Sequence, residues 1–277
     1  MARAASYPRP MAVHLRYRIV DVFSDRPLAG NALCVVLDPA PEPVMQAIAR
    51  EVNLSETTFP VDTGDGTYDV RIFTPNDELP FAGHPSLGTA WAMGPGRWTQ
   101  TSSGAVVEID VDDDGAEMTQ PDPTLTEVDA AAAIAALGLP GAEGAWRAEV
   151  GGMTHVLVLT ESPIDRLTPD LAAVTVAARA AGAPSLVPVR RIDDDHLHVR
   201  AFVPGAGIAE DPGTGSAAGP IGVLAHRHWG TADAVTIRQG DEMGRPCRIQ
   251  VRVGPDGVRV GGRVAACAEG GLTLGPL

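Results

Sequence analysis

The chain has 277 residues, of which 44% are hydrophobic and 20% are charged, a profile typical of a globular protein. With a net charge of −14, nothing in the sequence suggests the basic face that binding to duplex nucleic acid requires, and no apolar run is long enough to cross a membrane. All 21 basic residues are arginine, which excludes a Schiff-base lysine, pyridoxal phosphate chemistry and a P-loop lysine.

The N-terminal residues and the cysteines bear on where the protein resides. Residues 1–12 carry Arg and Pro but no apolar segment of the kind that signal peptides contain. We expect them to form a loose extension, and Met11 could serve as an alternative start. The cysteines, Cys34, Cys247 and Cys267, form no C-x-x-C motif and indicate neither a zinc site nor a redox pair. A cytoplasmic protein with reduced thiols is the expectation.

The N-terminal region predicts two strands and a helix. Residues 17–23 alternate in the manner of a strand, and residues 32–37 form a second apolar strand after a turn at 25–31. Within residues 43–52 the apolar positions have helical spacing, and the helix is expected to end at residues 53–55. Another extended segment is expected to start at residue 57.

Glu56 lies at this expected junction between helix and strand, flanked by Leu54 and Phe59. A carboxyl group held partly away from water has a raised pKa and can transfer protons near neutral pH. By spacing alone, a surface glutamate beside Ser55 is the favoured interpretation, and a proton-transferring group is the alternative.

Two segments of the chain resemble each other. Residues 71–75 and 200–204 share the pattern R-x-F-x-P, and each leads through a polar loop into a Gly-rich turn and a run of small residues. We interpret the match as a duplication that creates two similar α+β halves with a cleft between them. The density of Val, Ile and Gly favours mostly antiparallel sheets wrapped around a helix. Residues 128–137 predict a helix early in the second half, and no GxGxxG motif indicates a dinucleotide fold.

The first Gly-rich turn contains Gly83-His84-Pro85, which places one imidazole on a turn made rigid by Pro85. The small residues that follow predict a helix whose N-terminal N–H groups favour an anion such as a substrate carboxylate. A simple Gly-Pro turn with an exposed histidine is an equally good interpretation of the same residues.

The second Gly-rich turn begins with Asp211-Pro212, which has the form of an N-cap followed by proline at the first helical position. The next residues, 213–216, predict a nest of N–H groups and hydroxyls that could bind a ligand. Both roles can hold together.

His196 and His198 alternate beside acidic residues 193–195, but a solvated acidic turn is the favoured interpretation, so no metal site is predicted.

Several motifs occur together in an order that indicates a family. NLSETTF, RIFTPNDELPFAGHPSLGTA, EDPGTGSAAGP and IRQGDEMGRP follow one another, after the start IVDVFSDRPLAGN. From about residue 17 to the C-terminus the sequence resembles the PhzF-like phenazine-biosynthesis isomerases. The resemblance implies a diaminopimelate-epimerase-like α+β fold with two pseudo-symmetric halves, here 1–121 and 122–277. It also implies a homodimer and an active site between the halves that needs no metal or organic cofactor.

The same resemblance implies the roles of individual residues. Glu56 matches the catalytic acid/base of the family, and the matching substrate-binding residues are Ser55, Gly83, His84, Asp211, Gly215 and Ser216. The implied reaction is isomerisation of trans-2,3-dihydro-3-hydroxyanthranilate, a cyclic amino acid with a carboxylate. Pro212 departs from the Ala that follows the aspartate in the phenazine enzymes, so the motif supports the family better than the substrate.

Two other functions stay open. Related epimerases and proline racemases use a pair of cysteines at the two Gly-rich turns, and neither 81–90 nor 210–220 contains one. One carboxylate suits a proton shift within a substrate better than inversion by two opposed bases. A racemase, epimerase or dehydratase of another modified amino acid is the first alternative. A catalytically silent protein that binds a small molecule is the second.

Overall fold

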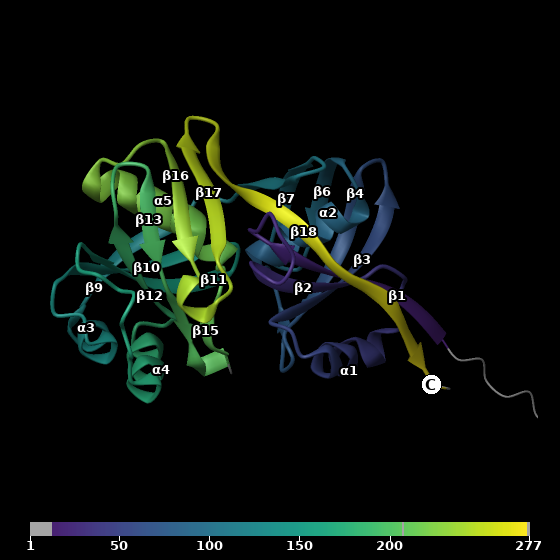
Figure 1. Ribbon diagram of the computed structural model, residues 1–277, viewed down its shortest axis with the longest axis horizontal. Helices are drawn as coiled ribbons and strands as arrows, with labels where there is room; N and C mark the ends of the chain where they lie inside the picture. The colour runs from purple at the N-terminus through teal and green to yellow at the C-terminus, as the bar shows by residue number, and fades with distance from the viewer. Residues whose placement is uncertain (1–12, 207, 276–277) are drawn as a thin grey trace, which may run out of the picture.

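The computed structural model describes residues 13–206 and 208–275, so the expected loose extension at 1–12, including Met11, lies outside the described residues. The described chain has a mixed α/β fold with five α-helices and two lobes (Figure 1). The strand β18 (Gly257–Leu274) crosses from one lobe to the other. None of the helices within the described ranges is long and apolar enough to span a membrane.

The first lobe is a closed β-barrel. Its strands pair in a ring that returns to its starting point, because β18 pairs with both β8 and β1. The short β5 (Glu78–Leu79) adds to β4 at one edge. In ring order the strands are β1 (Val13–Val22), β2 (Asn31–Val36), β3 (Glu56–Gly64), β4 (Thr67–Phe73), β6 (Gly96–Thr101), β7 (Val106–Val111), β8 (Gly115–Gln120) and β18.

The second lobe is a curved sheet that continues from the start of β18. Two short strands, β14 (Ala201–Val203) and β15 (Ile208–Asp211), extend it beside β12. The main strands, in sheet order, are β9 (Thr124–Val128), β10 (Ala142–Val150), β11 (Met153–Thr160), β12 (Leu186–Arg191), β13 (His196–Val199), β16 (Ala234–Gln239) and β17 (Cys247–Gly254).

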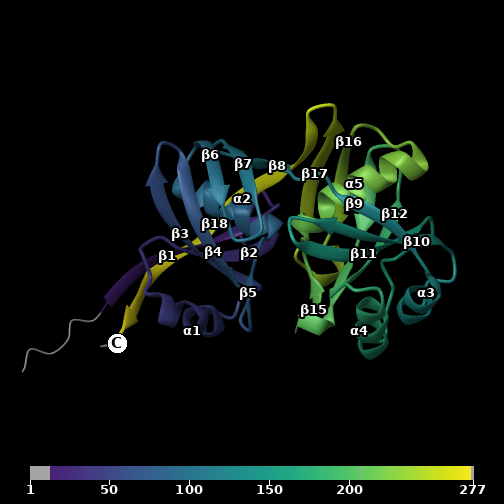
Figure 2. The ribbon, with the colours of Figure 1, turned by 180° about the vertical axis from the view of Figure 1, so that it is seen from behind.

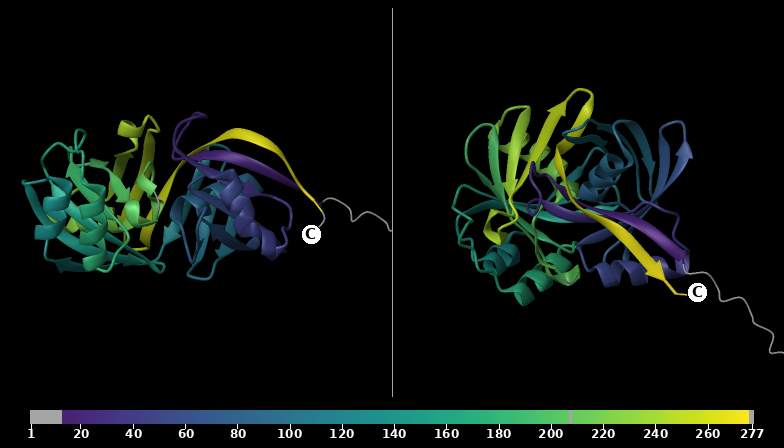
Figure 3. Two further views of the ribbon diagram at one scale, coloured as in Figure 1. Left: turned by 90° about the horizontal axis from the view of Figure 1, so that it is seen from below. Right: turned by 45° about the vertical axis from the view of Figure 1, so that its right-hand side comes forward.

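Most strand pairs are antiparallel, as the sequence predicts. The parallel exceptions are β2–β3, β4–β6, β11–β12 and β13–β16. Because β1 and β18 pair antiparallel, with Val13 opposite Leu274, the two ends of the described chain lie side by side (Figure 3). The C-terminal part of β18 therefore belongs to the barrel that the N-terminal strands build.

Each lobe encloses one helix, α2 (Gly83–Met93) in the first and α5 (Gly215–Trp229) in the second (Figure 2). Small residues let most of α2 and residues 215–225 of α5 be buried, because strands can approach the helix backbone closely. At Gly88, for example, an added Cβ would lie 2.7 Å from side-chain atoms of Leu33 and Val22. The expected helices within the two Gly-rich segments are confirmed.

Three further helices lie on the outside of the lobes (Figure 1). They are α1 (Glu42–Val52), α3 (Ala131–Leu137) and α4 (Leu171–Ala180), with short 3₁₀ turns at Pro204–Ala206 and Asp241–Met243. Helix α1 matches the predicted helix and ends at Asn53, whose φ of 54° is left-handed. Helix α3 is shorter than the predicted 128–137 because β9 pairs with β10 as far as Val128.

The two R-x-F-x-P segments make matching side-chain contacts. The guanidinium of Arg71 lies 5.2 Å from the ring centre of Phe73, and that of Arg200 lies 4.9 Å from Phe202. Each arginine also makes two parallel hydrogen bonds to a glutamate, Glu78 or Glu210 respectively. These arginine–glutamate pairs fix the strands that lead into α2 and α5.

Candidate active site

The N-termini of α2 and α5 meet where the two lobes join. A Cβ at Gly83 would lie 2.5 Å from the carbonyl carbon of Gly215 and from the amide nitrogen of Ser216. A Cβ at Gly215 would lie 2.8 Å from the amide nitrogen of His84. Only glycines allow this backbone contact. It brings the positive ends of two helices, with their free N–H groups, to one place.

Glu56 begins β3 beside this junction, and its side chain is only 12% exposed. Its Oε2 atom lies 3.2 Å from Nε2 of His84. Burial, together with the nearby negative charge of Asp211, raises the pKa of Glu56 to about 8. The interpretation of Glu56 as a surface residue is therefore wrong, because β3 packs against β2 and β4 and carries the carboxyl group inward.

His84 lies in the first turn of α2 and is buried, so the alternative of an exposed histidine on a simple turn is wrong. Burial lowers its pKa to about 3, so the imidazole is neutral near pH 7. One ring nitrogen faces Glu56. The other, Nδ1, lies 3.2 Å from Nδ2 of Asn31.

Asp211 reaches the same junction from the second lobe. The expectation that it caps α5 is wrong, because it ends β15, and the capping position belongs to Thr214. Its pairing with Ala201 holds it in the strand. The Asp211 carboxylate accepts hydrogen bonds from Nδ2 of Asn31 at 2.9 Å and from the Thr214 hydroxyl at 2.5 Å. Burial raises the pKa of Asp211 above its ordinary value.

The side chain of Gln239 forms hydrogen bonds with the loop that follows Asp211. Its Nε2 donates to the Asp211 carbonyl at 2.8 Å and to the Thr214 hydroxyl at 3.0 Å. Its Oε1 accepts from the Thr214 amide at 3.1 Å. Both ends of one buried amide therefore fix the conformation of the Gly-rich turn before α5 begins.

The hydroxyls of Ser55 and Ser216 have defined partners. Ser55 donates to Oδ1 of Asn31 at 3.1 Å. Ser216 is 3.0 Å from Nε2 of His155, whose Nδ1 lies 2.8 Å from the Ser185 hydroxyl. Burial lowers the pKa of His155 to about 4, so it stays neutral near pH 7. Ser216 is thus oriented from the second lobe.

None of the cysteines supplies a second base. Burial raises the pKa of Cys34 to about 12 and that of Cys247 well above its ordinary value. Cys247 lies beneath the second Gly-rich turn, where a Cβ on Gly213 would be 2.7 Å from its sulfur. Its thiol is close to the site but protonated. A mechanism that needs two thiolates is unsupported by this geometry.

Three residues of the site, Asn31, His155 and Gln239, were not predicted from the sequence. Asn31 ends a segment that also fits an ordinary turn, and Gln239 ends a strand among other polar residues. His155 had one usable signal, because it is a polar residue within the otherwise apolar strand β11. All three have partners in distant parts of the chain.

The acidic turn near His196 does not join the site. His196 faces Asp193 and Asp195 at 3.0 and 2.7 Å, and all three are accessible to solvent. His198 turns instead to Glu242, at 2.8 Å. The two histidines therefore have separate partners and do not converge on one point.

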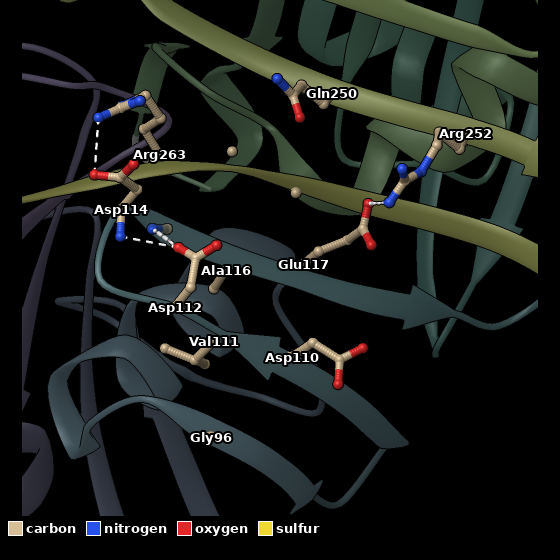
Figure 4. A pocket seen from close by; sticks show the side chains of 13 residues that line it. Gly96, Asp110, Val111, Asp112, Asp114, Ala116, Glu117, Gln250, Arg252 and Arg263 are labelled. Carbon is tan, nitrogen blue, oxygen red and sulfur yellow. Dashed lines mark hydrogen bonds and ion pairs between the residues drawn. The ribbon is translucent and has the colours of Figure 1, made fainter.

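A pocket of about 470 Å³ lies apart from the site, on strands β7, β8, β17 and β18 (Figure 4). Its acidic residues Asp110, Asp114 and Glu117 each pair with arginine, as in Arg263–Asp114 and Arg252–Glu117, and Asp112 accepts backbone N–H groups. Glu56 differs from these residues, because it is buried without an arginine partner among the described residues and its pKa is strongly shifted, which makes it the stronger candidate for a functional group.

Comparison with known structures defines the fold class as one that amino-acid epimerases share. A hydroxyproline epimerase from Agrobacterium vitis superposes with a TM-score of 0.66 over 95% of this chain and 93% of that chain. The two sequences are 11% identical, so this likeness shows the fold alone.

The family follows from closer matches. The family model described as "Phenazine biosynthesis-like protein" matches residues 20–270, and the chain belongs to this family of isomerases. A trans-2,3-dihydro-3-hydroxyanthranilate isomerase from Pseudomonas aeruginosa is 38% identical over 92% of this chain and 98% of its own length. A PhzF-family structure from Bacillus anthracis covers 94% of this chain and 99% of its own, with a TM-score of 0.82 and 22% identity.

Proposed function

We propose that this isomerase acts without a cofactor on trans-2,3-dihydro-3-hydroxyanthranilate in phenazine biosynthesis, with Glu56 as its acid/base. The observation that carries the proposal is the buried Glu56 carboxyl group at the junction of two helix N-termini. A pKa of about 8 lets one carboxyl group both accept and return a proton near neutral pH. The substrate of the Pseudomonas aeruginosa relative is a cyclic amino acid of the kind this site suits.

In the proposed reaction the substrate carboxylate docks at the N–H groups of Gly83, Gly215 and Ser216. The ionised Glu56 takes a proton from one ring carbon and returns it to another carbon of the conjugated system. The proton removed equals the proton added, so the reaction is balanced without an oxidant or a co-reactant. The enol-like intermediate carries negative charge that the N–H groups and neutral His84 stabilise.

The pH dependence of the reaction follows from the pKa of Glu56. The base form of Glu56 is scarce well below pH 8, so kcat/KM should rise as the pH increases toward about 8 and then level off. The measurement is kcat/KM from about pH 6 to about pH 10, because this ratio reports the pKa of the free enzyme. A profile that is already level at pH 6 would contradict a raised pKa at Glu56.

The fate of the proton tests the type of reaction. In deuterium oxide, we expect turnover of trans-2,3-dihydro-3-hydroxyanthranilate to place any solvent deuterium on the ring carbon that receives the proton, as seen by NMR. Trans-4-hydroxyproline is the matched substrate for the epimerase alternative. Deuterium at the α-carbon of hydroxyproline, with no turnover of the dihydro-compound, would favour the alternative.

Two structural expectations extend the proposal. The division into pseudo-symmetric, diaminopimelate-epimerase-like halves, 1–121 and 122–277, is supported by the matching arginine–phenylalanine–glutamate sets before α2 and α5. A homodimer is supported by β18, since residues 264–274 pair with β1 on one side and have no strand partner on the other within the described chain.

A further inference from the structure

The amide of Asn31, a residue with no role in the function proposed above, connects both lobes at the site. Its Oδ1 accepts the hydroxyl of Ser55, whereas its Nδ2 lies 3.0 Å from the carbonyl oxygen of Gly213. A carbonyl oxygen can only accept, so the NH₂ group must point toward Gly213. The chemistry of its neighbours therefore settles which way this amide faces. Asn31 is 1% exposed, so no solvent competes for these bonds.

The orientation of Asn31 determines the tautomer of His84. Nδ1 of His84 lies 3.2 Å from the same NH₂ group, which only donates. The two hydrogens of this NH₂ group are shared among Asp211, Gly213 and Nδ1. An amide nitrogen accepts no hydrogen bond, so a hydrogen on Nδ1 would have no acceptor there, and Nδ1 is the unprotonated nitrogen. The neutral imidazole then carries its hydrogen on Nε2, the atom 3.2 Å from Oε2 of Glu56.

We propose that Asn31 is a positioning residue that holds His84 as the Nε2–H tautomer and so prevents His84 from taking a proton from Glu56. This inference rests on the proposed role of Glu56 as the acid/base. Nε2 of His84 is already protonated, and Nδ1 faces the NH₂ group of Asn31, which only donates. Nε2 of His84 has no hydrogen-bond partner among the described residues. His84 can therefore donate a hydrogen bond to the substrate, but it cannot serve as a second base.

Asp211 is restrained by the same amide. Both of its carboxylate oxygens accept hydrogen bonds, one from Asn31 and one from Thr214. Glu56 is then the group at the junction that is free to exchange a proton with a substrate carbon. A single free base keeps the proton on one side of the substrate, as a shift between two carbons requires and as inversion by two opposed bases does not.

The test is the tautomer of His84 in the full-length protein labelled with ¹⁵N-histidine. Two-bond proton–nitrogen correlation spectra distinguish the two neutral tautomers, and the His84→Gln variant identifies the signals of His84. We expect the Nε2–H pattern in the wild-type protein. In Asn31→Asp, a carboxylate oxygen faces Nδ1, so we expect His84 to change to the Nδ1–H or the doubly protonated form and turnover to fall at least about 100-fold.

Asn76→Asp is the matched control, because Asn76 is exposed in the turn between β4 and β5 and the same charge is added there. It should keep the wild-type tautomer and activity. An Nδ1–H pattern in the wild-type protein would overturn the proposal, even if Asn31→Asp failed to fold, and so would an unchanged tautomer in a folded Asn31→Asp. The spectra need no substrate, so a wild-type protein inactive on the dihydro-compound would overturn the proposed function and leave this result intact.

Discussion

Glu56→Gln is expected to lower turnover by about 10³-fold or more while the fold is retained. Glutamine has nearly the shape of glutamate but cannot take a proton, and acid–base catalysis of this kind typically contributes 10²- to 10⁴-fold. The measurement is kcat at the pH optimum of the wild-type protein. Glu51→Gln is the matched control, because Glu51 lies on the exposed side of α1 and should leave the rate unchanged. Near wild-type turnover in Glu56→Gln would contradict the assignment.

The same variant is expected to be more stable than the wild type at alkaline pH. The pKa of Glu56 is raised from 4.5 to about 8 by burial, so the folded state binds a proton that the unfolded state has lost between these values. This contribution to stability is fully present below about pH 4.5 and is lost as the pH rises through about 8. At about pH 9, Glu56→Gln should gain about 2–4 kcal/mol in the free energy of unfolding.

Urea denaturation at about pH 9 and about pH 4.5 measures this difference. The gain should shrink toward zero at the lower pH, where the carboxyl group is protonated in both states. Glu51→Gln should show no comparable change with pH. If Glu56→Gln were less stable than the wild type at both pH values, the carboxyl group would have a stabilising partner that the geometry around it does not show.

Gly83→Ala is expected to destabilise the junction of the lobes by about 3 kcal/mol. Its Cβ would lie 2.5 Å from backbone atoms of Gly215 and Ser216, and backbone cannot rotate out of the way as a side chain can. The N-termini of α2 and α5 would have to separate, so turnover should fall as well. Urea denaturation gives the stability, and an assay of the folded variant gives the rate.

Gly254→Ala is the matched control for this substitution. Gly254 ends β17, a Cβ added there would meet no atom within 4 Å beyond its two chain neighbours, and its backbone does not have a positive φ. We expect its stability to stay close to that of the wild type. Equal stability and equal activity of the two glycine variants would show that the close contact at Gly83 does not hold the lobes together.

Hydrophobic periodicity predicted the local elements of the fold well. The strands at 17–23 and 32–37 and the helix at 43–52 correspond to β1, β2 and α1, with ends that differ by a few residues. These elements depend on near neighbours in the sequence, such as the apolar positions that α1 buries at Met45, Ile48 and Ala49. The closed ring of the first lobe could not be predicted, because β18 completes it from the far end of the chain.

For the site, the sequence by itself determined the residue types and their short motifs, among them Glu56, His84 and the two Gly-rich turns. Only the tertiary structure decided that Glu56 is buried, that Asp211 ends a strand instead of capping α5, and that Asn31 contacts both lobes. The physical reason is that a pKa and a tautomer depend on desolvation and on the donors and acceptors around a group. Here those neighbours lie far apart in the sequence and meet only when the two lobes fold together.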